Sequence, residues 1–175
     1  MQDLAIWGEV RDENVFVAIE AKVLESFGSY LVRDEYERAL QYKNNINRNS
    51  NKPDRIREIV ADFFPGLSPY DEPVCNLRYQ LLHYLKGSLE EGISLRESKK
   101  RVGMRRNPKI IVLPVLVFKT RHYYEDTAKA DLNKNDYEDF CLTLGFTKVQ
   151  YGGKFFYSKE IKGRKVFTIY EEIDV

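Results

Sequence analysis

The chain has 175 residues, enough for one domain with a real hydrophobic core, and 43% of them are hydrophobic. Its 28 basic and 27 acidic residues give a net charge of +1, which excludes a strong overall attraction to nucleic acid and leaves that role to local patches. No apolar run is long enough to span a membrane, no signal-peptide pattern opens the chain, and Cys75 and Cys141 lack a metal-type spacing. We therefore expect a single domain over residues 1–175, cytoplasmic and reduced, with no membrane partner.

The first half of the chain predicts a β-hairpin followed by helices. The hairpin has two Val- and Ile-rich strands around a polar turn. The helices have apolar residues at helical spacing, and Asp54 is expected to cap the second of them. The expected elements are strands at 3–10 and 15–23, and helices at 34–43, 55–64 and 74–95.

The second half predicts one central strand, one helix and a final hairpin. The run KIIVLPVLVFKT is the most apolar in the chain, which is typical of a strand buried on both faces. Pro114 within it cannot donate a hydrogen bond and predicts a bulge or an edge position. The expected elements are a strand at 109–120, a helix at 133–146, and strands at 154–161 and 165–173. This order predicts a mixed sheet flanked by helices, of the α/β or α+β class.

The second predicted strand carries two charged residues, Glu20 and Lys22, within an otherwise apolar run. If Val10 and Val15 close the hairpin turn, the register sets Asp3 opposite Lys22. Cross-strand partners and alternate residues share a face, so all three charged residues are expected to meet on one side of the sheet. The opposite side is expected to be apolar core, formed by Leu4, Ile6, Val15, Val17 and Ile19.

Two neighbouring carboxylates repel each other and are costly to desolvate. A divalent cation removes this conflict, because Mg²⁺ prefers oxygen ligands and is commonly held by one or two carboxylates together with water or phosphate. A lysine beside such an ion can position a water molecule and neutralise developing charge. Asp3, Glu20 and Lys22 therefore predict a metal-assisted site that acts on phosphate esters, with Mg²⁺ or Mn²⁺ as the cofactor.

At these residues the chain resembles the PD-(D/E)XK nuclease superfamily, whose signature is an aspartate on one strand and Glu-x-Lys on the next. Here these are Asp3 and Glu20-Ala21-Lys22, with Gln2 in place of the signature proline. The resemblance implies a restriction-endonuclease-like fold in which Asp3, Glu20 and the Ala21 carbonyl bind the metal and Lys22 acts on the water. That fold usually opens with a helix before the aspartate strand, so we expect an N-terminally shortened core, as in a small bacterial branch.

A second motif strengthens the resemblance. Gln80 and Tyr84 form a Gln-x-x-x-Tyr pair on the predicted helix 74–95, and their i, i+4 spacing sets both polar groups on one helix face. RecB-like branches of the superfamily carry this motif beside the active site. The resemblance therefore implies that Gln80 and Tyr84 support the catalytic residues, and it covers roughly residues 1–120. The alternative is a helix whose Tyr84 packs in the hydrophobic core.

The basic segment KKRVGMRR at 99–106 predicts contacts to a nucleic-acid backbone, which require positive charge but no sequence code. A solvated loop is the alternative. The candidate contacts are Lys99, Lys100, Arg101, Arg105 and Arg106.

Three further polar residues have two interpretations each. Glu25 is a supporting metal ligand or an exposed loop residue. Arg78 contacts a phosphate or forms a surface salt bridge. His83 is a general base or an ordinary histidine of the core or surface.

The sequence thus leads to a Mg²⁺-dependent nuclease-like domain acting on phosphodiester bonds of nucleic acid, with DNA as the favoured partner. A catalytically inactive module that binds nucleic acid or a protein is the second hypothesis. A purely structural α/β domain with a surface Glu–Lys pair is the third.

Overall fold

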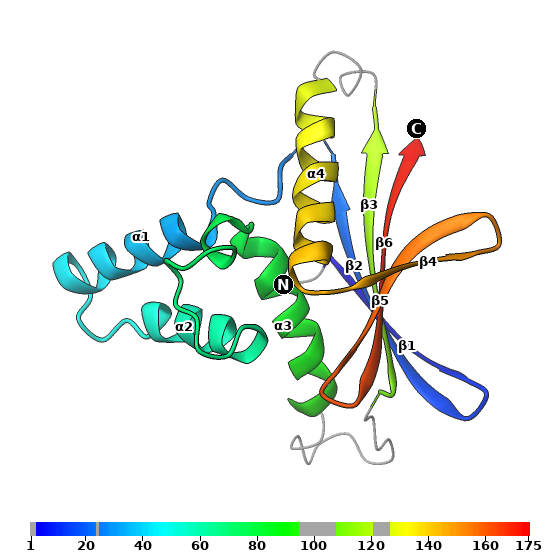
Figure 1. Cartoon of the computed structure of the whole chain (residues 1–175), viewed down its shortest axis with the longest axis horizontal. Helices are drawn as coiled ribbons and strands as arrows, with labels where there is room; N and C mark the ends of the chain where they lie inside the picture. The colour runs from blue at the N-terminus through cyan, green and yellow to red at the C-terminus, as the bar shows by residue number, and fades with distance from the viewer. Residues whose placement is uncertain (1–2, 24, 95–107, 121–126) are drawn as a thin grey trace.

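The computed structural model describes residues 3–23, 25–94, 108–120 and 127–175. Within them, six strands form one mixed sheet and the helices pack against one of its faces (Figure 1). The architecture is α/β in a single domain, as the sequence predicts. The elements follow in this order: β1 Leu4–Val10, β2 Glu13–Lys22, α1 Val32–Asn45, α2 Lys52–Phe63, a 3₁₀ turn at Val74–Asn76, α3 Tyr79–Ser94, β3 Ile110–Lys119, α4 Thr127–Thr143, β4 Thr147–Tyr151, β5 Lys154–Ile161 and β6 Arg164–Asp174.

The sheet has the strand order β1-β2-β3-β6-β5-β4. Its centre is parallel, because β3 pairs in parallel with both β2 and β6. Antiparallel pairs extend it on both sides, with β1 beside β2 and with β5 and β4 beyond β6. The predicted strand at 109–120 is β3, and it lies in the same sheet as the hairpin, which confirms that prediction. The strand β4 was not predicted.

The hairpin register differs from the predicted one. A two-residue turn at 11–12, with φ of 50° and 63°, joins the strands, in place of the expected four-residue turn. Positive φ at both positions is the conformation that matches the twist of paired strands. Leu4 therefore pairs with Ile19, and continuing the register by one residue sets Asp3 opposite Glu20. A shift by two residues keeps every side chain on its predicted face.

The burial of the two hairpin faces is the reverse of the prediction. Glu20 and Lys22 share their face with Phe16, which is fully buried beneath the helices. On the opposite face, Leu4 is 52% exposed and Ile6 is 45% exposed. Both faces of β2 are largely apolar, so the alternation of the sequence could not say which face the helices cover.

The hydrophobic core lies between the sheet and the helices. Its largest fully buried side chains come from β2, β3, α2, α3 and α4 and from the segment after β2: Tyr137, Phe16, Phe27, Ile56, Leu81, Leu82, Leu85, Ile111 and Leu113. No helix of the described residues is long and apolar enough to cross a membrane.

Several helix boundaries differ from those predicted. The helix α2 begins at Lys52, with Pro53 in its first turn, so Asp54 lies inside the helix and does not cap it. The predicted helix 74–95 is divided, because Leu77 is extended between the 3₁₀ turn and α3. The helix α4 begins at Thr127, six residues before its predicted start.

Pro114 lies in the middle of β3, which is a central strand. Val17 pairs with Val112 and Glu20 pairs with Val115, so the register with β2 is the same before and after the proline. The expected bulge or edge position is therefore wrong. The missing N–H of Pro114 removes a hydrogen bond of the ladder, and the compensation for it comes from α3.

Candidate functional site

The candidate site forms at the end of β2, where Glu20 and Lys22 make a buried ion pair. The Lys22 Nζ lies 2.7 Å from Glu20 Oε1, and each side chain is 5% exposed. Their separation by one residue on the strand brings both side chains to the helix-covered face. A pair this well buried persists only if each charge keeps good partners, because desolvation is costly.

Gln80, in the first turn of α3, provides a second partner for Glu20. Its Nε2 donates to Glu20 Oε1 at 2.7 Å, so one carboxylate oxygen accepts from both the ammonium and the amide. The chain between β2 and α1 passes close to this amide at Gly28, where φ is +68° and a Cβ would lie 3.4 Å from Gln80 Oε1. The Glu-x-Lys strand and the Gln-x-x-x-Tyr helix, 60 residues apart, therefore meet at a single carboxylate.

Asp3 lies beside the same strand end, just before β1. Its Oδ2 accepts a hydrogen bond from the Ala21 N–H at 2.7 Å, and its own N–H donates to the Ile19 carbonyl at 3.0 Å. The N–H and C=O of one strand residue point to the same side, so the Ala21 carbonyl is also directed to the Asp3 side. Asp3 is therefore held against Ala21 and lies opposite Glu20 across the hairpin, although Asp3 is exposed while Glu20 is buried.

Tyr84 has a structural role that the sequence did not reveal. In a parallel ladder, the Ala18 carbonyl would accept from the N–H at position 114, and proline has none. The Tyr84 hydroxyl donates to the Ala18 carbonyl in its place and lies 3.3 Å from the Pro114 carbonyl. Burial raises the pKa of Tyr84, and the negative charges of Glu20 and Asp3 raise it further. Tyr84 therefore stays a neutral hydrogen-bond donor close to both carboxylates.

The available donors fit Mg²⁺ or Mn²⁺ better than a softer ion. Among the residues that the structure describes, no three His, Cys, Asp or Glu side chains gather as a metal cluster. Two carboxylates, one backbone carbonyl and water are nevertheless a sufficient donor set for Mg²⁺, which keeps several waters. Asp3 and Glu20 would hold such an ion, with the Ala21 carbonyl as a third protein ligand.

Three residues that the sequence analysis did not select hold the segment after β2 in place at this site. The Phe27 ring is fully buried, and its centre lies 5.7 Å from the Lys22 Nζ. The Nδ2 of Asn133, on α4, donates to the Glu25 carbonyl at 2.8 Å, which holds the loop against that helix. Gly28 is the third. A glycine in a loop is a sequence signal for a positive φ angle, which Gly28 has. The sequence gives no such signal for Asn133, which lies 108 residues from its partner Glu25.

Glu25, Arg78 and His83, which each had two interpretations from the sequence, lie in three different surroundings. The Glu25 carboxylate is 64% exposed and lies 3.9 Å from Lys22 Nζ, so it borders the site. Arg78 forms a partly buried ion pair with Asp136 at 2.8 Å, which favours its salt-bridge interpretation. Burial raises the pKa of Asp136 although Arg78 opposes that shift. His83 is half-buried on α3, and its ring lies 5.7 Å from the Tyr79 ring.

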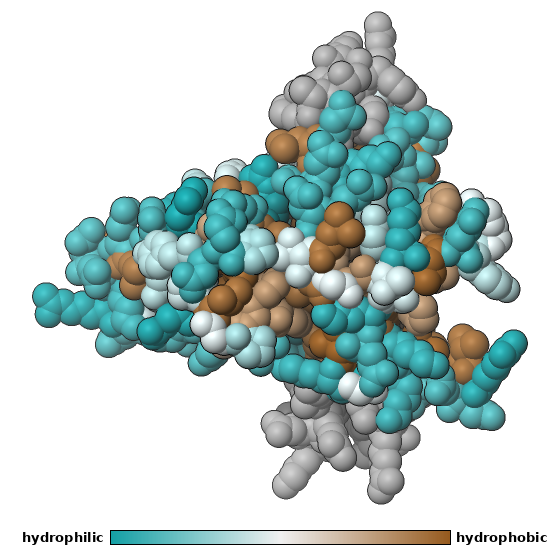
Figure 2. Space-filling view, in the orientation of Figure 1, coloured by the Kyte–Doolittle hydropathy of each residue, from teal (hydrophilic) through white to brown (hydrophobic). Residues whose placement is uncertain are grey.

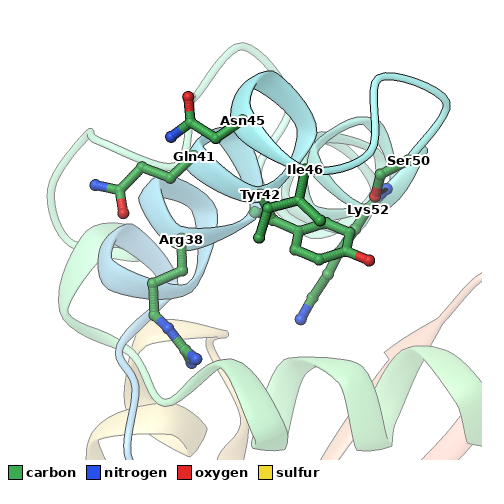
Figure 3. Close-up of a pocket in the computed structure, with 8 residues that line it drawn as sticks. Arg38, Gln41, Tyr42, Asn45, Ile46, Ser50 and Lys52 are labelled. Carbon is green, nitrogen blue, oxygen red and sulfur yellow. Dashed lines mark hydrogen bonds between the residues drawn. The ribbon is translucent and has the colours of Figure 1, made fainter.

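The predicted backbone-contact residues, Lys99, Lys100, Arg101, Arg105 and Arg106, lie outside the described residues. A basic groove of about 470 Å³ occurs elsewhere, along α1 and the connection to α2 (Figure 3). The side chains of Arg38 and Lys52 extend from it on the same side, and both contact Glu35, at 3.5 and 2.5 Å. Two cations face one carboxylate there, so the groove retains a positive charge.

Comparison with known proteins gives a family but no activity. The model of a family described as a domain of unknown function, DUF6946, matches residues 1–174. The chain belongs to the DUF6946 family. No curated protein and no solved structure matches it.

Proposed function

We propose that this protein is a metal-dependent nuclease of the PD-(D/E)XK type, hydrolysing phosphodiester bonds in nucleic acid, with DNA as the favoured substrate. The observation that carries the proposal is the meeting of four motif residues around one strand end. Glu20 accepts from Lys22 and from Gln80, each at 2.7 Å, and Asp3 is held against Ala21. A surface Glu–Lys pair, the purely structural hypothesis, would not be 95% buried or connected to a distant helix.

Each residue has a role that follows from its contacts. Asp3 and Glu20 would hold a Mg²⁺ or Mn²⁺ ion with the Ala21 carbonyl, and this ion would supply a more acidic water and charge neutralisation at the phosphate. Lys22 would orient the attacking water and stabilise negative charge on the phosphate. Gln80 would fix the carboxylate of Glu20, which leaves its second oxygen for the ion.

The substrate class is supported by charge on the side of α1 and α2. Burial lowers the pKa of His83, and the positive charges of Arg55 and, less strongly, of Lys52 lower it further, so positive charge reaches α3 from the neighbouring helix. Arg38 and Lys52 border the groove in Figure 3. A phosphate backbone needs only such a series of cations for binding without sequence preference. The basic segment at 99–106 stays a further predicted contact.

The inactive binding module is the second candidate, and one observation favours it. Lys22 already neutralises the Glu20 charge at 2.7 Å, and the Ala21 N–H occupies one oxygen of Asp3. A cluster that is satisfied without an ion has less need to bind one. This candidate predicts nucleic-acid or protein binding with no cleavage.

The proposal is tested by incubating labelled single- and double-stranded DNA and RNA with the protein and Mg²⁺ or Mn²⁺. We expect cleavage of at least one substrate, loss of it with EDTA, and loss of it in Lys22→Met. The matched control is Lys43→Met on α1, where the lysine pairs with Asp54 at 3.0 Å, outside the site. Circular dichroism must show that Lys22→Met is folded at the assay temperature.

Binding is measured in parallel, because it separates the two candidates. Intact substrates under every condition, together with saturable binding of nucleic acid that needs no metal, would exclude the nuclease and support the inactive module. Replacing Lys99, Lys100 and Arg101 with Ala should weaken such binding for all sequences alike and reduce its salt dependence.

A further inference from the structure

The face of the sheet opposite the helices is apolar, and no described residue covers its centre. Figure 1 shows all the helices on one side of the sheet, and Figure 2 shows apolar side chains at the surface on the other side, between the hairpin β1–β2 and the hairpin β4–β5. Ile6 on this face is 45% exposed, and the central side chains are only half-buried. We call this surface the open face and define it by Ile6, Ile19, Val112, Leu116, Phe167 and Ile169.

An open face of this kind is unusual for a sheet with a parallel centre. Parallel strands normally have both faces covered, and their sequences are then apolar throughout. The strand β3 has that sequence: its residues Leu113 and Val115 are buried under the helices, while Val112 and Leu116 on the open face are equally apolar. The sequence of β3 is thus that of a strand covered on both sides.

The open face carries no charge across its middle. Two successive rows across β2, β3 and β6 are wholly apolar: Val17, Val112 and Phe167, and then Ile19, Pro114 and Ile169. The charged residues of this face, Lys165 and Glu171, lie one row further out on β6. A nucleic acid, a metal ion or a strongly charged protein would find no complementary group there. The surface suits a partner with the same property, and a second copy of this chain presents the same apolar face.

The size of the open face also agrees with a dimer. Four strands about 4.8 Å apart and about 30 Å long give a footprint on the order of 600 Å², before the relief of the side chains is counted. A standard stable interface buries about 800 Å² on each partner. Leu4 and Val10 lie on the same face of β1 as Ile6 and are exposed, so they belong to this apolar area.

We infer that the open face is the interface of a homodimer, in which the sheets of two copies pack face to face around a two-fold axis. Two twisted sheets pack in this way in β-sandwiches, with their inner side chains interdigitated. The cluster at Glu20 lies on the opposite, helix-covered face, so dimerisation leaves both sites outside the interface. The inference therefore stands or falls independently of the nuclease activity.

The experiment is sedimentation velocity of the full chain over a wide range of protein concentration. We expect a species with twice the 20.6 kDa mass of the chain. Ile169→Lys, at the centre of the open face, should raise the dimer dissociation constant at least about ten-fold. Ile46→Lys is the matched control, because Ile46 is 74% exposed beyond the end of α1 and should leave the dimer unchanged.

Because a lysine within the sheet can also unfold the chain, Ile169→Thr is measured as a second, milder variant. Threonine keeps the branched Cβ that strands favour but removes apolar surface, so it should weaken the dimer while circular dichroism stays native. A wild-type chain that is monomeric at every concentration would overturn the inference. A dimer that both Ile169 variants leave unchanged would also overturn it.

Discussion

Tyr84 on α3 supplies the hydrogen-bond donor that Pro114 on β3 lacks. The tyrosine hydroxyl donates to the Ala18 carbonyl, the acceptor that a non-proline residue at 114 would satisfy. The second residue of the Gln-x-x-x-Tyr motif thus holds the sheet together at the proline. It also fixes α3 over the end of β2, and this positions Gln80 on the Glu20 carboxylate.

Removing the Tyr84 hydroxyl should cost stability only while Pro114 is present. Tyr84→Phe leaves the buried Ala18 carbonyl without a donor, and we expect a loss of about 2 kcal/mol in the free energy of unfolding. Pro114→Val restores an N–H in the ladder, so Tyr84→Phe should cost less than about 1 kcal/mol in that background. Urea unfolding of the wild type, the two single variants and the double variant measures the coupling. Equal costs in both backgrounds would show that the hydroxyl does not replace the proline's missing donor.

Breaking the Glu20–Lys22 pair should destabilise the fold. The hairpin pattern alone sets both charges on the face away from the apolar core, whereas in the structure that face is the one covered by the helices. Because both side chains are 5% exposed, Glu20→Gln leaves a buried ammonium without its anion. We expect a loss of about 3 kcal/mol in the free energy of unfolding at neutral pH.

The double variant Glu20→Gln/Lys22→Met is the control for this prediction. It removes both charges, so it should be more stable than Glu20→Gln alone. Chemical denaturation of the three proteins provides the comparison. A Glu20→Gln protein as stable as the wild type would mean that the pair is solvated.

His83 should make the protein less stable in mild acid. Burial lowers the pKa of His83 below its ordinary 6.5, and the positive charges of the amino terminus, Arg55 and Lys52 lower it further, against a smaller effect of Glu90. The unfolded chain therefore binds the proton more tightly. The stability that is present above pH 6.5 is lost as the pH falls from 6.5 through the folded-state pKa.

Thermal melts between neutral pH and pH 5 test this titration. His83→Gln should flatten the fall in melting temperature over that range, because glutamine has no proton to gain. Identical pH profiles for the variant and the wild type would contradict the lowered pKa of His83.

The sequence predicted the class of fold because hydrophobic periodicity is local. The runs around Phe16 and Leu113 are strongly apolar and bounded by polar turns, so the strands β2 and β3 were predictable. The strand β4 was missed because it is only five residues long, TKVQY, with one aliphatic residue and no fully buried position. The covered face of the sheet was not predictable, since Leu4 and Phe16 are equally apolar and only the packing of distant helices distinguishes their faces.

The candidate site was predictable where its chemistry is local in sequence. Glu20 and Lys22 share a face by strand alternation, and Gln80 was identified by its Gln-x-x-x-Tyr spacing to Tyr84. The contacts that hold the site were not predictable, because Asn133 and Pro114 are distant in sequence from the residues they affect. The turn at 11–12 was predictable in position but not in length, because its polar residues suit several turn types. The length of the turn is what sets the register of the hairpin.

The central claim is that Asp3 and Glu20 together bind one divalent ion, and calorimetric titration of the protein with Mn²⁺ tests it most directly. Asp3→Ala should lower the affinity at least about ten-fold, whereas Glu9→Ala, an exposed acidic residue of the same strand region, should leave it unchanged. The account predicts one ion per chain in the wild type and in Glu9→Ala. A wild-type protein that binds no Mn²⁺, or an Asp3→Ala protein that binds it as tightly as the wild type, would contradict the account.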